Sequence, residues 1–243
     1  MARRTNPLLP ELTTDPGRDC DLCPRLRNFI LSNRTQEPDW HNAPVPSFTA
    51  SNPGLLIVGL APGLRGANRT GRPFTGDWAG DLLYETLLDF GFANGNYDER
   101  PDDGLTLEGC MITNAVRCVP PQNKPTPAEI KTCRTFLSNI IVHEKSLTSV
   151  LALGRIAHES LVRACGLKPA HYPFGHGASF PITLEDGRKL TLFDSYHCSR
   201  YNTNTGVLTR KMFRDVFKAL RRHIDTQARS SQTSKAKISS TKF

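Results

Sequence analysis

The residue types best suited to chemistry fall in three separate segments of this 243-residue chain. Residues 59–80 carry six glycines around Phe74 and Asp77, so the backbone can approach a ligand closely beside an aromatic ring and a carboxylate. Asn114 follows an apolar run, and its amide can both donate and accept hydrogen bonds. His197 follows another apolar run and can donate a hydrogen bond to a developing negative charge. These types suit the binding of a planar polar ring with bond cleavage beside it.

The cysteines form a second constellation. Seven are present, an odd number that argues against a disulfide framework and for thiols that bind metal or lie in the core. Cys20 and Cys23 form a C-x2-C pair, which suits zinc or an iron-sulfur cluster. A zinc ribbon needs a second such pair, whereas a cubane cluster tolerates wider spacing. We therefore expect a 4Fe-4S cluster held by Cys20, Cys23, Cys118 and Cys133, with zinc and four unligated thiols as alternatives, and Cys110, Cys165 and Cys198 in the core.

Alternating strand and helix patterns must position these residues. Strands are predicted at 55–58, 109–116, 149–153, 180–184 and 189–193, and helices at 20–32, 78–90, 126–143, 155–164 and 207–224. The Asp186-Gly187 dipeptide predicts a hairpin between the last two strands. The order predicts a three-layer α/β/α sandwich around a mostly parallel central sheet, with ligands at the carboxyl ends of the strands.

We expect one domain over residues 1–226, including an N-terminal cluster-binding segment, followed by a basic, disordered tail over residues 227–243. The tail contains Arg229, Lys235, Lys237 and Lys242 and no acidic residue. It is either a basic arm that raises nonspecific affinity for DNA or simply a solvated tail.

Charge and hydropathy limit the function classes. Lysine and arginine outnumber aspartate and glutamate by 31 to 23, a net charge of +8 that favours a polyanionic partner, with nucleic acid first. The longest apolar run, 55–61, is far below the roughly 20 residues that span a bilayer. The N-terminus lacks a secretory signal pattern. We therefore expect a cytoplasmic, nucleoid-associated protein that is a monomer and binds no membrane.

The sequence resembles a known family in three stretches. They are GLAPG at 59–63 continuing through NRTGRPFTGD at 68–77, TNAVRC at 113–118, and HCSR at 197–200 with NTNTG at 202–206. With the four cysteines they resemble the type 5 uracil-DNA glycosylases, prokaryotic cluster-bearing members of the uracil-DNA glycosylase superfamily. The resemblance covers about residues 20–224.

This resemblance implies a monofunctional DNA glycosylase that hydrolyses the N-glycosidic bond of uracil and other deaminated or damaged bases, leaving an abasic site for base excision repair. Phe74 would stack the extruded base, Asn114 would read N3 and O4 of uracil, and His197 would donate a hydrogen bond to O2. Asp77 would position water or stabilise the sugar cation. Each residue also has a structural interpretation. Phe74 could be a core phenylalanine and Asn114 a strand-end cap. His197 could be a structural histidine and Asp77 a helix N-cap.

The resemblance also implies wider contact sets. Substrate contacts are expected from Gly59, Leu60, Ala61, Gly63, Phe74, Asn114, Arg200 and Asn202, and contacts to the DNA backbone from Arg65, Asn68, Arg69 and Arg72. Leu60 is apolar and cannot bind water usefully, so catalysis falls to Asp77 and His197 or to the electrostatics of the DNA. Tyr201 stands where the family would place a glutamine, and it is either a wedge between bases or an ordinary surface tyrosine.

Two other functions fit the residues less well. One is a non-enzymatic iron-sulfur DNA-binding redox sensor, which would release no base. The other is a nucleotide phosphoesterase that uses the glycine-rich loop as a phosphate cradle, although the usual phosphate-loop motifs are missing. Its carboxylate pair would be Asp102 and Asp103, which we interpret as a solvated turn.

Overall fold

A six-stranded sheet forms the centre of the computed structural model, which describes residues 13–239, with side chains through residue 229. The strand order is β1-β5-β2-β6-β8-β7. β2, β5, β6 and β8 run parallel, and β1 and β7 pair antiparallel at the two edges. The strands of this sheet are β1 (Phe48–Thr49), β2 (Leu55–Gly59), β5 (Cys110–Asn114), β6 (Ser149–Leu153), β7 (Ser179–Thr183) and β8 (Lys189–Ser195). β3 (Ala93–Asn94) and β4 (Thr106–Leu107) form a separate two-stranded ribbon.

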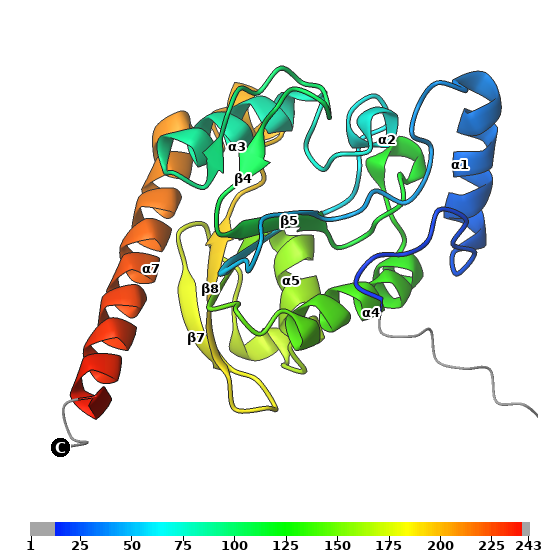
Figure 1. Ribbon diagram of the computed structural model, residues 1–243. Coiled ribbons are helices and arrows are strands. Elements are labelled where there is room, and N and C mark those ends of the chain that lie inside the picture. The colour runs from blue at the N-terminus through cyan, green and yellow to red at the C-terminus, as the bar shows by residue number, and fades with distance from the viewer. Residues whose placement is uncertain (1–12, 240–243) are drawn as a thin grey trace, which may run out of the picture.

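Helices cover both faces of the sheet (Figure 1). They are α1 (Pro24–Gln36), α2 (Ala67–Thr70), α3 (Trp78–Asp89), α4 (Pro127–His143), α5 (Arg155–Ala164), α6 (Arg200–Asn204) and α7 (Arg210–Ser239), with short 3-10 turns at Pro121–Asn123 and Pro169–His171. Thr126 caps the N-terminus of α4, and Glu129 completes a capping box.

Strand β2 shows why the sheet is covered on both sides. All five of its residues are buried. Leu55 and Ile57 belong to the core that contains α3 and α7 residues, whereas Leu56 and Val58 belong to the core that contains α4 and α5 residues. A strand buried on both faces therefore shows a continuous apolar run instead of an alternating one. The predicted α/β/α sandwich with a mostly parallel sheet and a β7–β8 hairpin is confirmed.

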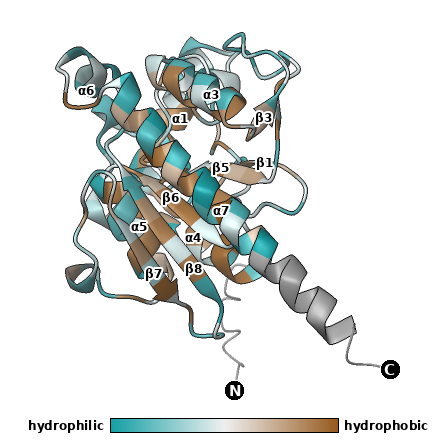
Figure 2. Ribbon diagram, turned by 90° about the vertical axis from the view of Figure 1, so that its left-hand side faces the viewer, coloured by the Kyte–Doolittle hydropathy of each residue, from teal (hydrophilic) through white to brown (hydrophobic). Residues whose placement is uncertain are grey.

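The C-terminal tail differs from its prediction. Helix α7 packs against the sheet (Figure 2) and ends at Ser239, although we expected residues 227–243 to be disordered. This segment contains neither proline nor glycine, and extending a helix that already packs on the sheet is cheap once its first turns are formed. Residues 240–243 of the predicted tail lie outside the described residues. None of the described helices combines the length and apolar character needed to cross a membrane.

Candidate active site

The site lies at the carboxyl ends of four neighbouring strands, as predicted. Gly59 ends β2 and pairs in register with Asn114, which ends β5. Gly154 follows β6, and His197 lies two residues after β8. A Cβ atom on Gly154 would lie 3.5 Å from the His197 Cβ atom, so these two strand ends are in contact.

Gly59 forms the floor between two of the predicted side chains. A Cβ atom at this position would lie 2.4 Å from Cζ of Phe74 and 2.5 Å from Oδ1 of Asn114. Real Cβ contacts are essentially never this short, so only glycine fits here. The close approach brings the aromatic ring and the amide together at one point of the sheet edge.

The backbone of Phe74 is held in an unusual conformation. Its φ of 54° lies in the left-handed region that side-chain-bearing residues seldom adopt. The Tyr84 hydroxyl donates to the Pro73 carbonyl at 2.6 Å, and the Tyr97 hydroxyl donates to the Phe74 carbonyl at 3.3 Å. Gly80 lets α3 approach, since a Cβ there would lie 1.9 Å from the Phe74 carbonyl oxygen. Surrounding residues therefore impose this conformation.

His197 faces the Phe74 ring. Their ring centroids are 5.9 Å apart with planes inclined by 27°. Burial lowers the pKa of His197 to about 4, so the imidazole is neutral near pH 7 and carries one N–H donor. Asn202 donates from Nδ2 to the His197 carbonyl at 2.8 Å. Asn202 therefore positions the histidine backbone, a role that its predicted substrate contact did not anticipate.

The side chains of Asn114 and His197 are free to bind a ligand. Asn114 is only 4% exposed, yet within residues 13–239 no hydrogen bond engages its amide. The His197 ring nitrogens are likewise unengaged across the described chain, where only the backbone carbonyl of His197 bonds to a side chain. Neither side chain is among the fully buried polar atoms that lack a partner, so the amide and the imidazole are available to hydrogen-bond a ligand.

Asp77 both caps a helix and presents a second carboxylate oxygen. Oδ1 accepts a hydrogen bond from the Ala79 amide at 3.1 Å at the start of α3. Oδ2 lies against the glycine-rich loop, where Cβ atoms on Gly63 and Gly66 would approach it to 3.0 and 2.4 Å. Burial raises the pKa of Asp77, while backbone N–H groups oppose that rise. The two predicted roles of cap and functional carboxylate are therefore compatible.

A cavity of about 320 Å³ opens beside the histidine. Leu60, His197 and Asn202 line it together with the start of α5 and Phe174. His158 holds the segment that carries Phe174. Its ring nitrogens bond to Asp194 Oδ1 and to the Tyr172 carbonyl, each at 2.7 Å. This buried imidazole has both nitrogens satisfied and is structural.

Two predicted DNA-backbone contacts are wrong because their side chains lie inside the domain. Asn68 is fully buried and donates to Oδ1 of Asn42 at 2.8 Å. Arg72 is 5% exposed and bonds to both carboxylate oxygens of Asp103 at 2.8 and 2.7 Å. The Arg72 guanidinium also lies 5.3 to 5.8 Å from the ring centroids of Phe48, Tyr84 and Tyr97.

The Arg72 pair also corrects the interpretation of the 102–103 turn. The Asp102 side chain is exposed as expected, but that of Asp103 is buried and anchors the loop to Arg72. The Asp103 carboxylate also accepts from the backbone of Asp98 and Leu105, each at 3.0 Å. Asp103 therefore anchors the loop through Arg72. Asp102 and Asp103 do not form the carboxylate cluster that a phosphoesterase would need.

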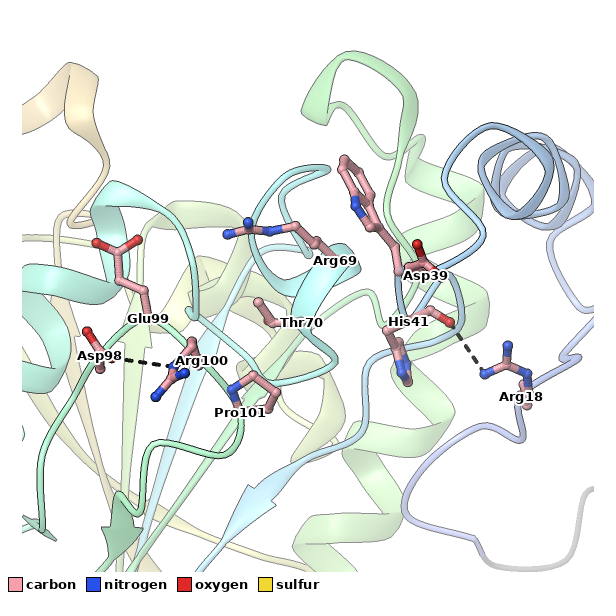
Figure 3. Close-up of a pocket in the computed structure, with 10 residues that line it drawn as sticks. Arg18, Asp39, His41, Arg69, Thr70, Asp98, Glu99, Arg100 and Pro101 are labelled. Carbon is pink, nitrogen blue, oxygen red and sulfur yellow. Dashed lines mark hydrogen bonds and ion pairs between the residues drawn. The ribbon is translucent and has the colours of Figure 1, made fainter.

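Arg65, Arg69 and Arg200 are exposed, and Ala61 is partly buried, so their predicted contacts stay predictions. Arg69 lies on a broad cavity of about 740 Å³ between the N-terminal segment and the 98–101 loop (Figure 3). A Cβ on Gly76 would lie 2.7 Å from an Arg69 guanidinium nitrogen, so this arginine borders the Asp77 loop. The acidic side chains of Asp39, Asp98 and Glu99 line the same cavity.

The four predicted ligand cysteines gather at one side of the domain. Cys118 and Cys133 are buried in a small apolar cluster, and Cys23 packs against it. Burial raises the pKa of Cys118, and the neighbouring thiols, which include Cys20 and Cys23, raise it further. The Arg117 backbone N–H donates to Cys133 Sγ at 3.3 Å. Across residues 13–239, no group of three or more His, Cys, Asp or Glu is arranged to hold a single metal ion. Cys110, Cys165 and Cys198 are buried as predicted.

Two kinds of contact around the site had no signal in the sequence. Tyr84 and Tyr97 hold Phe74 from outside the three motifs, and a tyrosine in an amphipathic or loop segment usually indicates only packing. Trp78 stands beside Asp77, but its hydrogen bond to Thr203 joins residues that are 125 positions apart. Such pairs become visible only in three dimensions.

The fold and the site define an α/β protein that brings an aromatic ring, an unengaged amide and a neutral imidazole together at the carboxyl ends of its strands. The model of the uracil DNA glycosylase superfamily matches residues 46–221. The chain therefore belongs to that superfamily.

Relatives of known type cover most of the chain. A type-5 uracil-DNA glycosylase of Thermus thermophilus is 44% identical over 84% of this chain and 93% of its own length. One of Mycobacterium tuberculosis is 39% identical over 82% of this chain and 76% of its own length. A type-4 uracil-DNA glycosylase of Archaeoglobus fulgidus is 27% identical over 74% of this chain and 75% of its own length. The similarity to type-5 proteins agrees with the resemblance found in the motifs.

Proposed function

We propose that the protein is a uracil-DNA glycosylase that hydrolyses the N-glycosidic bond of uracil in DNA and leaves an abasic site. The observation that carries this function is that Phe74 meets Asn114 at Gly59 and faces His197 with its ring. The amide and the imidazole lack hydrogen-bond partners within the described chain, although both are at least partly buried. An extruded uracil supplies the missing partners.

Recognition uses the ring face and the edge of the base. The base stacks on Phe74, whose position is fixed by the hydroxyls of two tyrosines. The Asn114 amide has an acceptor for N3–H and a donor for O4, so it matches the edge of uracil. A cytosine presents a donor and an acceptor in the opposite order, and the same amide orientation would leave both pairs mismatched.

Bond cleavage develops negative charge on the base and positive charge on the sugar. The neutral His197 donates its N–H to O2 of the departing base, where the charge grows. Asp77 opposes the positive charge on the sugar or orients the attacking water through Oδ2. The three motifs contain no lysine that would form a Schiff base with the sugar. The strand therefore stays intact after the base leaves.

We propose a substrate range that extends beyond uracil to other deaminated or damaged bases. Apolar Leu60 lines the cavity of about 320 Å³ beside His197, so there is room next to the imidazole without a polar group specific for uracil at that position. Initial rates on duplexes that carry uracil, hypoxanthine or etheno-cytosine test this range. Release of uracil alone would contradict it.

We propose that Cys20, Cys23, Cys118 and Cys133 hold a 4Fe-4S cluster. The donor set is four thiols beside one apolar cluster, with a backbone N–H directed at Cys133 Sγ. Their arrangement does not suit one metal ion, and a cubane cluster accepts more widely spread thiolates. When bound, the cluster would join the N-terminal segment to the start of α4, and Arg25 already pairs there with Glu129 at 2.7 Å.

Iron and acid-labile sulfide analysis of anaerobically purified protein tests the cluster. We expect equal amounts of iron and sulfide in the wild type and their loss in Cys20→Ser, whereas Cys165→Ser should retain both. Zinc in place of iron would contradict the proposal.

We further propose that the protein acts as a cytoplasmic, nucleoid-associated monomer, and gel filtration would show the oligomeric state.

Release of free base tests the activity itself. We expect wild-type protein to liberate uracil from labelled duplex DNA and Asn114→Ala to lose most of this activity while keeping its thermal stability. A protein that binds DNA but releases no base would instead fit the iron-sulfur redox sensor, which the comparisons do not favour.

A further inference from the structure

One wall of the cavity beside His197 comes from residues 172–177, here called the wall segment. This segment contains no helix or strand, and Phe174 lies on the cavity. The Phe174 ring packs against Tyr196, which directly precedes His197, with ring centroids 6.1 Å apart. The Arg155 guanidinium lies 5.3 Å from the Phe174 centroid. A segment without regular backbone hydrogen bonds needs other partners to hold it, and two histidines supply them here.

His158, on α5, holds the first end of the wall segment. Its Nδ1 lies 2.7 Å from Asp194 Oδ1, and its Nε2 lies 2.7 Å from the Tyr172 carbonyl oxygen. The Gly175 backbone N–H donates to the other Asp194 oxygen at 3.4 Å, so this carboxylate accepts on both sides. An imidazole has a donor on each nitrogen only when it is protonated. Two acceptors on opposite sides of the ring therefore require an imidazolium.

The surroundings of His158 favour this charged form. The side chains of His158 and Asp194 are 1% and 0% exposed, so water does not screen the pair. Burial alone would lower the pKa of His158, but the hydrogen bond and charge of Asp194 outweigh it and the pKa is raised, with Glu159 on the same helix adding to the rise. The other neighbours are uncharged rings: Phe174 and Phe180 meet the imidazole edge-on, with centroids 5.6 and 6.5 Å away.

His176 holds the other end of the wall segment in the opposite protonation state. Its Nδ1 accepts a hydrogen bond from the Tyr196 backbone N–H at 3.1 Å, so this nitrogen carries no proton. The two rings of His176 and Tyr196 stack with centroids 4.9 Å apart. Burial lowers the pKa of His176, although the Met212 backbone and the Asp215 carboxylate on α7 oppose that fall. A neutral imidazole therefore fits this position.

We propose that His158 and His176 are positioning residues that hold the wall segment against the end of β8, the first as an imidazolium and the second as a neutral imidazole. Neither histidine lines the cavity, so both act through Phe174. The wall is fixed only between the two titrations. At higher pH His158 loses a donor, and at lower pH the Tyr196 N–H loses its acceptor. This inference rests on the proposed function, because the ligand of the cavity is the DNA of that reaction.

Nuclear magnetic resonance of the full chain with ¹⁵N-labelled histidine tests the two protonation states without any activity. At about pH 7 we expect both ring nitrogens of His158 to carry protons and only one nitrogen of His176 to do so. Asp194→Asn keeps the size of the side chain but removes its charge, so His158 should lose its proton at a lower pH. His143→Gln, at the exposed end of α4, is the control and should leave both signals unchanged. A neutral His158 or a protonated His176 at this pH would overturn the proposal.

The affinity for DNA tests whether the wall positions the ligand. The duplex carries a tetrahydrofuran abasic-site analogue, so no base excision is needed, and binding is measured between about pH 5 and pH 9. We expect the affinity to fall roughly 3- to 10-fold as His158 loses its proton, the usual effect of one hydrogen bond. In Asp194→Asn the same fall should occur at a lower pH. The kcat of uracil release should stay unchanged across this step, because neither histidine lines the cavity.

The two failures are distinguishable. An affinity that does not follow the titration of His158 would overturn the positioning role and leave the proposed function intact. An affinity that follows this titration in a protein that releases no uracil would support the wall and contradict the proposed function.

Discussion

The rings of Phe74 and His197 lie 5.9 Å apart and nearly parallel, at 27°. Phe74 is placed by the loop after α2, and His197 by the segment after β8. A base that stacks on the phenylalanine, as we propose, would therefore lie next to the imidazole, which can donate to the charge that develops on the leaving group. Phe74, which would stack the base, and His197, which would donate the hydrogen bond, therefore border the same site.

His197 should act in its neutral form. Burial lowers its pKa to about 4, so the rate should not depend on its titration above about pH 5 and should fall as the pH approaches 4. His197→Ala should lower the single-turnover rate roughly 100- to 1000-fold, as the loss of other donors to a developing anion does. Single-turnover rates between pH 4 and 9 test this. A rate that rises on protonation near pH 6.5 would mean that an imidazolium acts instead.

Gly59→Ala should abolish activity. The new Cβ would lie 2.4 Å from Phe74 and 2.5 Å from Asn114 Oδ1, so one of these side chains must move. We expect at least a 100-fold loss of activity together with about 1–3 kcal/mol lost from the free energy of unfolding. Gly54→Ala is the matched control, since its new Cβ would meet nothing closer than 3.8 Å. Equal activity in both variants would contradict the pocket floor assigned to Gly59.

The contrast between Asn114 and Arg72 shows what the sequence can predict. The strand that ends at Asn114 can be predicted from the sequence. Residues 110–114 are all buried, and a strand that is buried on both faces shows an apolar run. The position of the amide then follows from parallel strands that share one edge. Arg72 stands in the same kind of motif, but its partners come from positions 48, 84, 97 and 103. A local pattern therefore predicts an exposed arginine, and only the tertiary fold shows the aromatic surroundings.

The length of α7 was unpredictable for a different reason. Residues 227–239 lack an amphipathic pattern, so composition favours disorder. The packed part of the helix, which contains Phe213 and Phe217 in the core, provides the starting turns for the extension. Periodicity predicts where a helix packs, and it says less about where a helix ends.

Asp77→Asn should separate the two roles of this carboxylate. Asparagine is as good an N-cap as aspartate, so the melting temperature should change little while activity falls because the charge is lost. Asp77→Ala should lose activity and also about 1 kcal/mol from the free energy of unfolding. Because burial raises the pKa of Asp77, the ionised form is lost as the pH falls, at a higher pH than for an exposed aspartate. Full activity in Asp77→Asn would show that the residue is only a cap.

Tyr97→Phe should impair activity through Phe74. The change removes only the hydroxyl that donates to the Phe74 carbonyl at 3.3 Å, while the ring stacked on Tyr84 at 4.5 Å remains. A small displacement of the stacking ring should lower kcat roughly tenfold, because misplacing a reacting group by 1 Å can cost up to 100-fold. Tyr172→Phe, on the opposite side of the core, is the control. If both variants keep wild-type kcat, Tyr97 does not position the platform.

The most direct measurement uses a duplex with one uracil, incubated with purified protein in the presence of EDTA and then divided into alkali-treated and untreated halves. We predict strand cleavage only after alkali, because the protein removes the base by hydrolysis without an added divalent metal and leaves the backbone intact. Asn114→Ala should give no cleavage in either half. Cleavage without alkali would contradict the monofunctional mechanism, and no cleavage in either half with wild-type protein would contradict uracil excision itself.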